Sequence, residues 1–406
     1  MQDNEKKPAL RFKGFTDPWE QRKLKELYFQ LTERNADLLP YQKTLSVATM
    51  SFKTDGNGAA DTSLANYKRL RTGDIAFEGH TSKEFRYGRF VLNDVGDGIM
   101  SPRFSALRPL HEMPINFWKY YIHYEPIMRK VLVNSTKAGT MMNELVINEF
   151  LQESILVPSV AEQQAIGRFF KQLDTLITLH QRKYEKLVNI KKSMLDKMFP
   201  QNGVSVPEIR FKGFTDPWEQ RKLEEYLEVS GQKNFEGIYT KEDVLSVSGD
   251  FGIVNQIEFQ GRSFAGASVA NYGVVETGDI VYTKSPLKSN PYGIIKANKG
   301  KNGIVSTLYA VYKPKQSANP EFVQIYFEQD ARMNNYMHPL VNKGAKNDMK
   351  VSAENALKGQ IVFPDIKEQR TISEFFHNLD TLITLHQRKL EKLQNIKKSC
   401  LEKMFV

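Results

Sequence analysis

The chain has a single cysteine, Cys400, among 406 residues, and this scarcity limits the chemistry open to it. One cysteine can form neither an intrachain disulfide nor a cysteine-based zinc cluster, a pattern that fits a reducing compartment. No stretch approaches the ~20 apolar residues of a membrane helix, and the N-terminal MQDNEKKPAL lacks the apolar run of a signal peptide. We therefore expect a cytoplasmic protein without membrane segments.

Motifs for catalysis are missing as well. No Gly-rich loop ends in Gly-Lys-Ser or Gly-Lys-Thr, so the sequence has no P-loop for phosphate binding. The glycines at 94–98 and 248–252 fall short of a dinucleotide fingerprint and are interpreted as turns. The seven histidines show no metal-ligand spacing. We expect no catalytic residue, no metal site and no cofactor in this chain.

The segment 289–292, Ser-Asn-Pro-Tyr, partly matches a methyltransferase element. Amino-methyltransferases hold a flipped base with an Asn-Pro-Pro-aromatic loop. Here the second proline is missing and no Gly-rich cofactor loop lies upstream. A plain Asn-Pro turn is therefore the favoured interpretation of Asn290.

Length and charge indicate the general class of protein. A chain of 406 residues is too long for one ordinary core and suits two domains with connecting elements. Lysine and arginine outnumber aspartate and glutamate by 57 to 47, which gives a formal net charge of +10. Since each neutralised phosphate releases counterions, this excess favours a polyanionic partner, most simply nucleic acid.

The chain is internally repeated. Residues 10–24, LRFKGFTDPWEQRKL, return at 209–223 with one change, and residues 173–199 return at 379–405 with four changes. Between these copies the halves diverge, but landmarks persist 205 residues apart, such as the Thr-Gly-Asp-Ile sequences that contain Asp74 and Asp279. The repeat predicts two units that share a fold but not a surface.

The near-identical C-terminal part of each half predicts a long helix. Between Arg168 and Phe199 there is no Gly or Pro, so the helix can run for about 35 residues, or roughly 50 Å. His180 and its copy His386 occupy equivalent positions, which favours a packing role for both. Apolar or aromatic residues recur every three or four positions, as in a coiled-coil seam: Ile166, Phe169, Leu173, Leu176, His180, Tyr184, Leu187, Ile190, Met194 and Met198.

The divergent domains show mixed patterns. Apolar runs bounded by Gly, Asn and Pro predict strands within 74–78, 278–283 and 303–312, and helices are expected within 116–132 and 320–337. The expected class is α+β, with two mixed α/β domains separated by a pair of long, antiparallel coiled-coil helices in a pseudo-twofold repeat. The expected boundaries are 1–158 and 201–364 for the domains, and 159–200 and 365–406 for the helices.

The duplicated FTDPWEQRKL block, the Thr-Gly-Asp-Ile landmarks and the repeated LDTLITLHQRK helix together resemble the specificity subunit of type I restriction-modification systems. The resemblance covers nearly the whole chain. It implies that each domain is a target-recognition domain that reads one half of a split, asymmetric site in double-stranded DNA. Two copies of a modification subunit with S-adenosylmethionine would bind the helices, and restriction subunits using ATP and Mg would join through them.

The resemblance also implies which side chains face DNA. They follow the Gly-Asp-Ile landmarks or lie around a late glycine loop. Arg and Asn can pair with guanine and adenine edges, while Lys more often holds phosphate. Asp74 and Asp279 are interpreted as turn or strand-end residues. The candidates are Lys83, Arg86, Arg89, Lys137, Thr140 and Asn143 in the first domain, and Lys284, Lys288, Asn290, Lys343, Lys346 and Asn347 in the second.

Two other functions stay open at this point. The chain could be a methyltransferase or nuclease that acts alone, although no cofactor loop or acidic metal cluster supports this. It could also be a coiled-coil adaptor without DNA specificity, which would leave two basic, divergent domains without a purpose. The DNA sequence recognised and the length of its gap cannot be derived from the chain.

Overall fold

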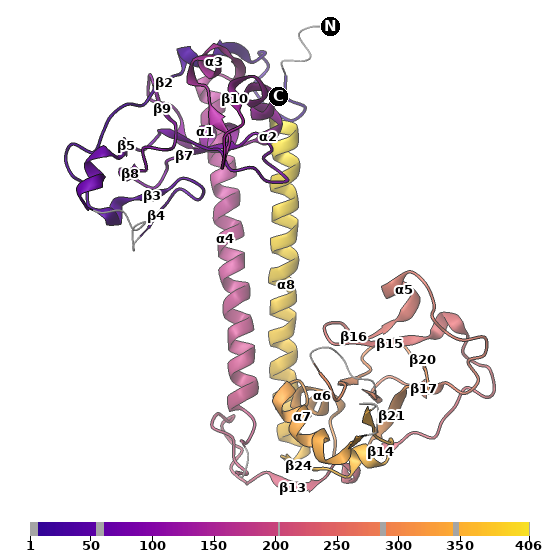
Figure 1. Cartoon of the computed structure of the whole chain (residues 1–406). Helices are drawn as coiled ribbons and strands as arrows, with labels where there is room; N and C mark the ends of the chain where they lie inside the picture. Colours follow the sequence, from indigo (N-terminus) through magenta and orange to yellow (C-terminus); the bar gives the residue numbers. More distant parts are fainter. Residues whose placement is uncertain (1–6, 54–60, 202–203, 285–289, 344–348, 406) are drawn as a thin grey trace. The chain divides into compact units, whose positions relative to one another are not determined.

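The structure, a computed structural model, describes residues 7–53, 61–201, 204–284, 290–343 and 349–405 (Figure 1). The chain forms two compact units: unit 1 comprises Met1–Gln181 with Arg388–Val406, and unit 2 comprises Arg182–Gln387. The long helices α4 (Val160–Lys197) and α8 (Ile366–Met404) each contribute to both units. This division cuts through both helices and does not test the domain boundaries expected from the sequence.

Unit 1 is built on a four-stranded antiparallel sheet with the order β2-β9-β6-β7. Its main core contains Trp19, Phe90 and Trp118, and it lies where the sheet meets the three short helices and the start of α4. The strands are β1 (Glu20–Lys23), β2 (Tyr28–Gln30), β3 (Leu45–Ser46), β4 (Ser51–Phe52), β5 (Lys68–Leu70), β6 (Ile75–Glu78), β7 (Arg89–Leu92), β8 (Gly98–Met100), β9 (Ala106–Pro109), β10 (Thr136–Lys137), β11 (Glu144–Leu145) and β12 (Ser154–Val157). The short helices are α1 (Ile115–Tyr121), α2 (Glu125–Ser135) and α3 (Ile147–Gln152).

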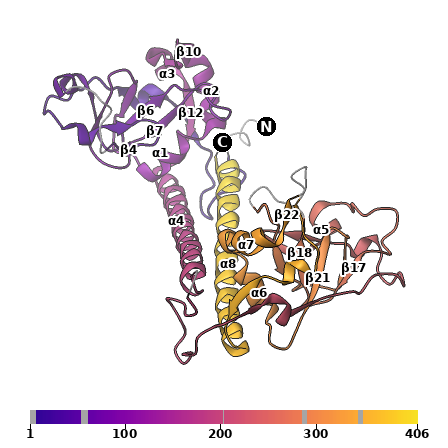
Figure 2. The ribbon, with the colours of Figure 1, turned by 60° about the horizontal axis from the view of Figure 1, so that its bottom comes forward.

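Unit 2 repeats this topology, with the sheet order β14-β21-β18-β19. Its helices α6 and α7 pack between the sheet and α8 (Figure 2). The strands are β13 (Glu219–Lys222), β14 (Leu227–Val229), β15 (Leu245–Ser248), β16 (Gly252–Asn255), β17 (Gly273–Val275), β18 (Ile280–Thr283), β19 (Ile295–Ala297), β20 (Gly303–Val305), β21 (Tyr309–Pro314), β22 (Asn342–Lys343), β23 (Met349–Lys350) and β24 (Gln360–Phe363). The short helices are α5 (Gln256–Gln260), α6 (Pro320–Tyr326) and α7 (Asp330–Met337). The expected fold class and the shared fold of the two halves are confirmed.

Within each unit a segment of α4 runs antiparallel to a segment of α8. In unit 1 Asp174 pairs with Lys397 at 2.7 Å, and in unit 2 their copies Asp380 and Lys191 pair at 2.8 Å. Phe170 packs on Phe405 further along the helices of unit 1. The same two residue types therefore fix the same helix register in both units.

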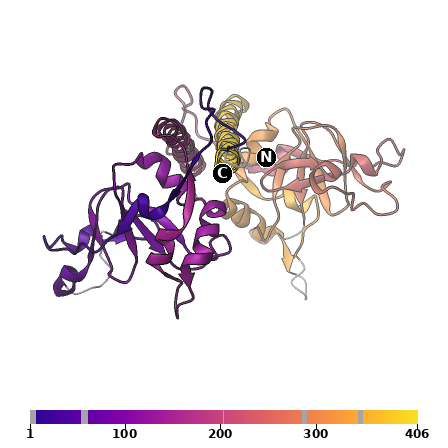
Figure 3. The same cartoon turned by 90° about the horizontal axis from the view of Figure 1, so that it is seen from above.

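The duplicated lead segments fasten the ends of the long helices. Arg11 donates two hydrogen bonds to Glu162 near the start of α4, and its copy Arg210 does the same to Glu368 of α8. The backbone N–H of Leu10 also donates to the Lys403 carbonyl at the end of α8, and Figure 3 shows this lead beside the helix end. The lead segment makes the same Arg–Glu hydrogen bonds in both units, which explains why its sequence is nearly unchanged.

The types of local structure are confirmed, with breaks that the sequence patterns did not place. The helical segments expected within 116–132 and 320–337 each contain two helices, α1 and α2 in unit 1 and α6 and α7 in unit 2. In unit 1, Pro126 lies in the first turn of α2, because proline cannot occupy a helix interior without losing a hydrogen bond. The expected strand at 303–312 is likewise two strands, β20 and β21.

The apolar stripe predicted for α4 is buried unevenly. Leu176 is 44% exposed, whereas Phe170 and Leu173 are buried, and Phe169 packs against Phe12 of the lead segment. The apolar stripe of α4 is wider than a two-helix seam requires. Its outer edge is left on the surface.

Candidate nucleic-acid interface

The Thr-Gly-Asp-Ile landmarks form the same turn in both units. Gly73 and Gly278 have positive φ angles of 95° and 93°, which glycine adopts without steric strain because it has no Cβ. The carboxylate of Asp74 accepts a hydrogen bond from the backbone N–H of Arg71 at 2.7 Å, and Asp279 closes its turn in the same way. The interpretation of both aspartates as turn residues is confirmed.

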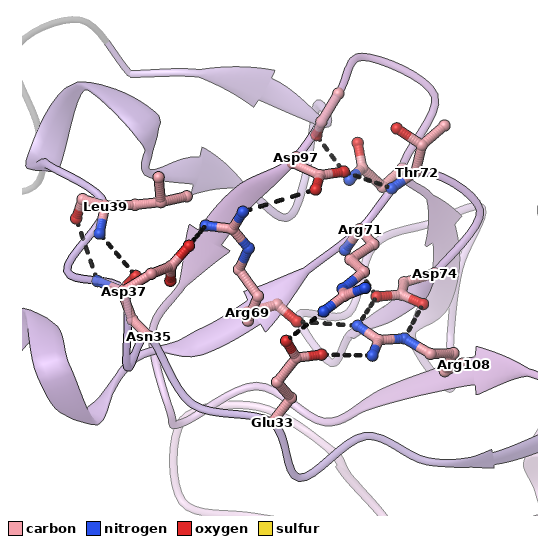
Figure 4. Close-up of polar contacts among 12 residues, drawn as sticks. Glu33, Asn35, Asp37, Leu39, Arg69, Arg71, Thr72, Asp74, Asp97 and Arg108 are labelled. Atoms are coloured by element: carbon pink, nitrogen blue, oxygen red, sulfur yellow. Dashed lines mark hydrogen bonds and ion pairs between the residues drawn. The ribbon is translucent and has the colours of Figure 1, made fainter.

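Asp74 also anchors a charged network in unit 1 (Figure 4). Arg108 donates to both carboxylate oxygens of Asp74, at 2.9 and 2.8 Å, and to Glu33, which also binds Arg71. Burial raises the pKa of Asp74, whereas the hydrogen bonds from Arg108 oppose this shift. Arg69 pairs with Asp37 at 3.2 Å in the same network. These arginines are paired with acidic partners, and Arg108 links β9 to the turn that precedes β6.

The structure brings together two segments of unit 1 that were predicted to face DNA. The backbone N–H of Asn143 donates to the Gly79 carbonyl at 2.9 Å, and its side-chain amide donates to the Arg86 carbonyl at 3.3 Å. A Cβ at Gly79 would collide with the Asn143 carbonyl, so this close approach requires glycine. The loop between β10 and β11 and the segment after β6 therefore form one surface.

The predicted side chains of unit 1 differ in how freely they reach solvent. Lys83, Arg86 and Thr140 are exposed. Arg89 is half-buried, because its guanidinium lies over the Phe85 ring at 4.9 Å and donates to a backbone carbonyl. Lys137 is exposed and pairs loosely with Glu144 across the β10–β11 hairpin at 3.3 Å. Nothing in this arrangement tests whether these residues contact DNA, so their assignment stays a prediction.

A hollow of about 940 Å³, called groove 1 here, opens beside this surface. It lies between the turn 48–50, strand β7, the junction of α1 and α2, and the facing parts of α4 and α8. Lys83 is on its rim. At its floor the Tyr120 hydroxyl donates to Asp174 at 2.5 Å, and Lys397 binds the other carboxylate oxygen. Burial raises the pKa of Tyr120, and Asp174 adds to the shift.

Groove 2 is the equivalent hollow of unit 2, with a volume of about 670 Å³. The turn 249–252 and Asn290 contribute to its wall, and Lys191 lies on its floor. Lys191 binds Asp380 at 2.8 Å and Glu328 at 3.0 Å. Burial acts to raise the pKa of Glu328, but Lys191 and a second lysine outweigh it and lower the pKa. The floor charges of both grooves are thus internally balanced.

The remaining predicted residues of unit 2 are placed only in part. Lys284 and Asn290 are half-buried, and the Asn290 carbonyl accepts from the Gly293 N–H at 3.0 Å, which confirms the Asn-Pro turn. The backbone of Lys343 is in β22, paired with β23. The other three, Lys288, Lys346 and Asn347, lie outside the described residues.

Sequence reasoning did not select two hairpin turns as candidate sites, 48–50 between β3 and β4 and 249–251 between β15 and β16. Each lines the groove of its unit, next to residues that were predicted to face DNA. The glycines at 248–252 predicted the second turn, but not its place beside groove 2. The first turn has no such glycine, and only pairing of its short strands identifies it.

Two other features are absent from the described part of the chain. No group of three or more His, Cys, Asp or Glu side chains could hold a metal ion there. Over the same residues, no helix combines the length and apolar character needed to cross a membrane. The seam histidines His180 and His386 are half-buried in the long helices.

The fold and the paired grooves define a class: a protein with two related globular domains that are joined by two long helices. No protein-family model matches the chain. A protein of Methanocaldococcus jannaschii, named as the specificity subunit of the type I restriction enzyme MjaX, is 22% identical over 423 residues. The match covers 94% of this chain and 91% of that protein.

Solved structures give the same result for the fold. The S subunit of a type I restriction-modification system from M. genitalium matches with a TM-score of 0.55 at 13% identity, over 98% of this chain and 99% of that one. The HsdS subunit from Thermoanaerobacter tengcongensis matches over 95% and 96%, with a TM-score of 0.46 at 16% identity. The resemblance drawn from the sequence is confirmed, and the chain shares the fold of the M. genitalium S subunit over nearly its whole length.

Proposed function

We propose that this chain is the DNA-specificity subunit of a type I restriction-modification complex and works in the cytoplasm. Each globular domain reads one half of a bipartite, asymmetric site in duplex DNA. One observation carries the proposal: two domains share a topology but have different surfaces, and the helices that accompany them are nearly identical. Different half-sites require different reading surfaces, whereas identical partners require identical docking surfaces.

The docking surface is the outer edge of the long helices. Leu176 and Leu179 are 44% and 45% exposed in unit 1, and their copies Leu382 and Leu385 are 45% and 44% exposed in unit 2. An apolar patch that is duplicated with the same exposure suits a partner that binds twice. We assign this face to two copies of the modification subunit, which supplies S-adenosylmethionine. Restriction subunits, which use ATP and Mg, join through that subunit.

The reading surface is the side of each domain where the predicted segments meet. In unit 1, Arg86 and Asn143 are joined by a hydrogen bond and offer side chains that suit guanine and adenine edges. Lys83 and Lys137 are exposed nearby and suit phosphate oxygens. Arg69 and Arg108 near Asp74 suit this role less, because acidic partners bind them and they are only 13% and 20% exposed, whereas Lys137 stays 66% exposed beside Glu144. The chain itself performs no catalysis in this proposal.

The test is an exchange of one domain. The chain is expressed with its modification and restriction partners in a host without other modification systems, and the methylated motif is read by sequencing that detects modified bases. Replacing residues 26–158 with the matching part of a related subunit should change one half of the motif and leave the other half intact. A motif whose halves change together would refute independent reading.

Two further measurements separate the alternatives. Methylation or cleavage of DNA by the purified chain alone would support an enzyme that acts by itself. Partner assembly without any defined motif would support a coiled-coil adaptor. The proposed function predicts neither result.

A further inference from the structure

The second domain presents an aromatic pair at the tip of a hairpin. Phe251 lies in the turn between β15 and β16 and is 67% exposed, and Phe259 of α5 is 45% exposed. Their ring centroids are 5.3 Å apart. Figure 1 shows α5 on the same flank of the domain as β15 and β16. Two adjoining phenylalanines on a surface leave apolar area in water, and such patches commonly mark binding sites.

The scaffold under this pair is well defined. The Phe251 N–H donates to the Ser248 hydroxyl at 3.2 Å, and Gly252 has a positive φ of 72° that lets the chain enter β16. Asn255 caps α5 by accepting hydrogen bonds from the Ile257 and Glu258 N–H groups. The exposed rings are therefore carried by a hairpin and a capped helix with satisfied backbone groups.

The tip lies beside Asn290, one of the residues that the resemblance predicts to face DNA. Phe251 and Asn290 line groove 2 together. In unit 1 the corresponding tip shows the same neighbourhood, because the Ala48 carbonyl accepts from Arg89 at 3.1 Å and Lys83 lines the same groove. Both hairpin tips thus adjoin the segment that follows the Gly-Asp-Ile landmark.

The two tips differ in chemistry. In the first domain Thr49 is exposed and its hydroxyl lies 2.7 Å from that of Ser51, while Met50 is buried. An exposed aromatic pair is found only at the second tip. A partner that binds twice needs the same surface twice, so this difference argues against the modification subunit as the occupant. Elements that read two different half-sites are expected to differ in this way.

We propose that Phe251, supported by Phe259, packs against a base of the second half-site and helps to determine its sequence. This inference rests on the proposed function. An uncharged ring can contact the methyl group of thymine in the major groove, or it can wedge against an unstacked base. Both contacts use the apolar surface of a base and neutralise no phosphate.

The experiment uses the complex with its modification subunits and a duplex carrying the motif that the wild-type complex methylates. Phe251→Ala should weaken binding by about tenfold or more, the scale of one lost base–aromatic contact. The dependence of binding on salt should not change, because no phosphate contact is lost. Methylation should become less selective at one position of the second half-site only.

Phe235→Ala is the matched control. Phe235 is 71% exposed in the same domain but is not among the residues that line groove 2. Its replacement should leave affinity and motif unchanged. Equal losses in both variants, or an unchanged Phe251→Ala complex, would overturn the proposal. Failure of Phe251→Ala to assemble with the modification subunit would also overturn it, since the patch would then bind protein.

Two modified duplexes identify the contact. Replacing thymine by uracil in the second half-site should weaken the wild type but not Phe251→Ala if the ring meets a methyl group. If the ring is a wedge, 2-aminopurine fluorescence should rise on binding of the wild type only. When neither duplex distinguishes the two proteins, Phe251 contacts no base and the idea is wrong. A wild-type complex that methylates no defined motif would refute the proposed function itself.

Discussion

The exposed leucines that repeat on the long helices, Leu176 and Leu179 with their copies Leu382 and Leu385, allow the strength of partner binding to be predicted. Complete burial of a leucine side chain contributes about 1.5–3 kcal/mol. Leu176 and Leu179 are 44% and 45% exposed, so docking can bury less than half of each, which is worth about 1 kcal/mol per residue. Replacing both by alanine should cost about 2 kcal/mol at one of two sites. This corresponds to an increase in Kd of about 30-fold.

The assay is a calorimetric titration with the modification subunit, supported by native mass spectrometry of the complexes. The wild type should bind two copies equally well, whereas Leu176→Ala/Leu179→Ala should keep one strong site. Leu382→Ala/Leu385→Ala should give the same result, because the repeat makes the sites equivalent. Val188→Ala is the control, since its copy is the polar Gln394. Two unweakened sites in either double variant would refute the assignment of this face.

Two predictions concern stability and are measured by urea denaturation. Glu368→Gln removes the buried carboxylate that pairs with the half-buried Arg210 and should cost about 3 kcal/mol, whereas the exposed Glu219→Gln should cost less than about 1 kcal/mol. Equal costs would contradict this reasoning. Burial lowers the pKa of His123, whose ring packs on Phe85, so its contribution to stability is present above its unfolded pKa and is lost as pH falls below about 6.5. Between about pH 7.5 and pH 5.5, the free energy of unfolding should fall less in His123→Asn than in the wild type. Equal falls in the two proteins would contradict this role of His123.

The internal repeat made most of the fold predictable. Nearly identical segments must fold alike, so the two long helices and the common topology of the domains followed from the sequence. The order of short strands did not, because pairs such as β5 with β8 join residues that are far apart along the chain. Helix periodicity identified an apolar stripe, but it could not separate the seam residue Leu173 from the exposed Leu176. Only the partner helix decides which part of a wide stripe is buried.

The segments that form the candidate interface could be predicted from the sequence, but the contacts between them could not. Asn143 and Arg86 were selected from different landmarks, and a hydrogen bond across 57 positions of sequence joins them. The hairpin tips were not selected because tip 48–50 has neither charge nor glycine to mark it, and the glycines at 248–252 indicated only a turn. The roles of Asp74 and Asp279 followed from their position before a strand, since the turn needs a short acceptor at that place.

The paired helices suggest a final prediction, that their length sets the gap between the half-sites. In unit 2 the pairing of Lys191 with Asp380 places Leu187 opposite Thr384, because antiparallel positions diverge equally from that pair. Inserting four helix-favouring residues after both Leu187 and Thr384 lengthens the helices by about 6 Å and rotates the apolar face by only about 40°. At about 3.4 Å per base pair, the gap should grow by one or two base pairs while both half-sites stay unchanged.

The methylated motif of this double insertion, read by modified-base sequencing, measures the effect. One base pair is the safer expectation, because the helices need not run parallel to the DNA and each added pair also rotates the distant half-site. A single insertion after Leu187 is the control. It displaces the seam of α4 against α8, so it should lower activity without defining a new gap. Full activity of the double insertion on the original gap would show that some other part of the complex sets the spacing.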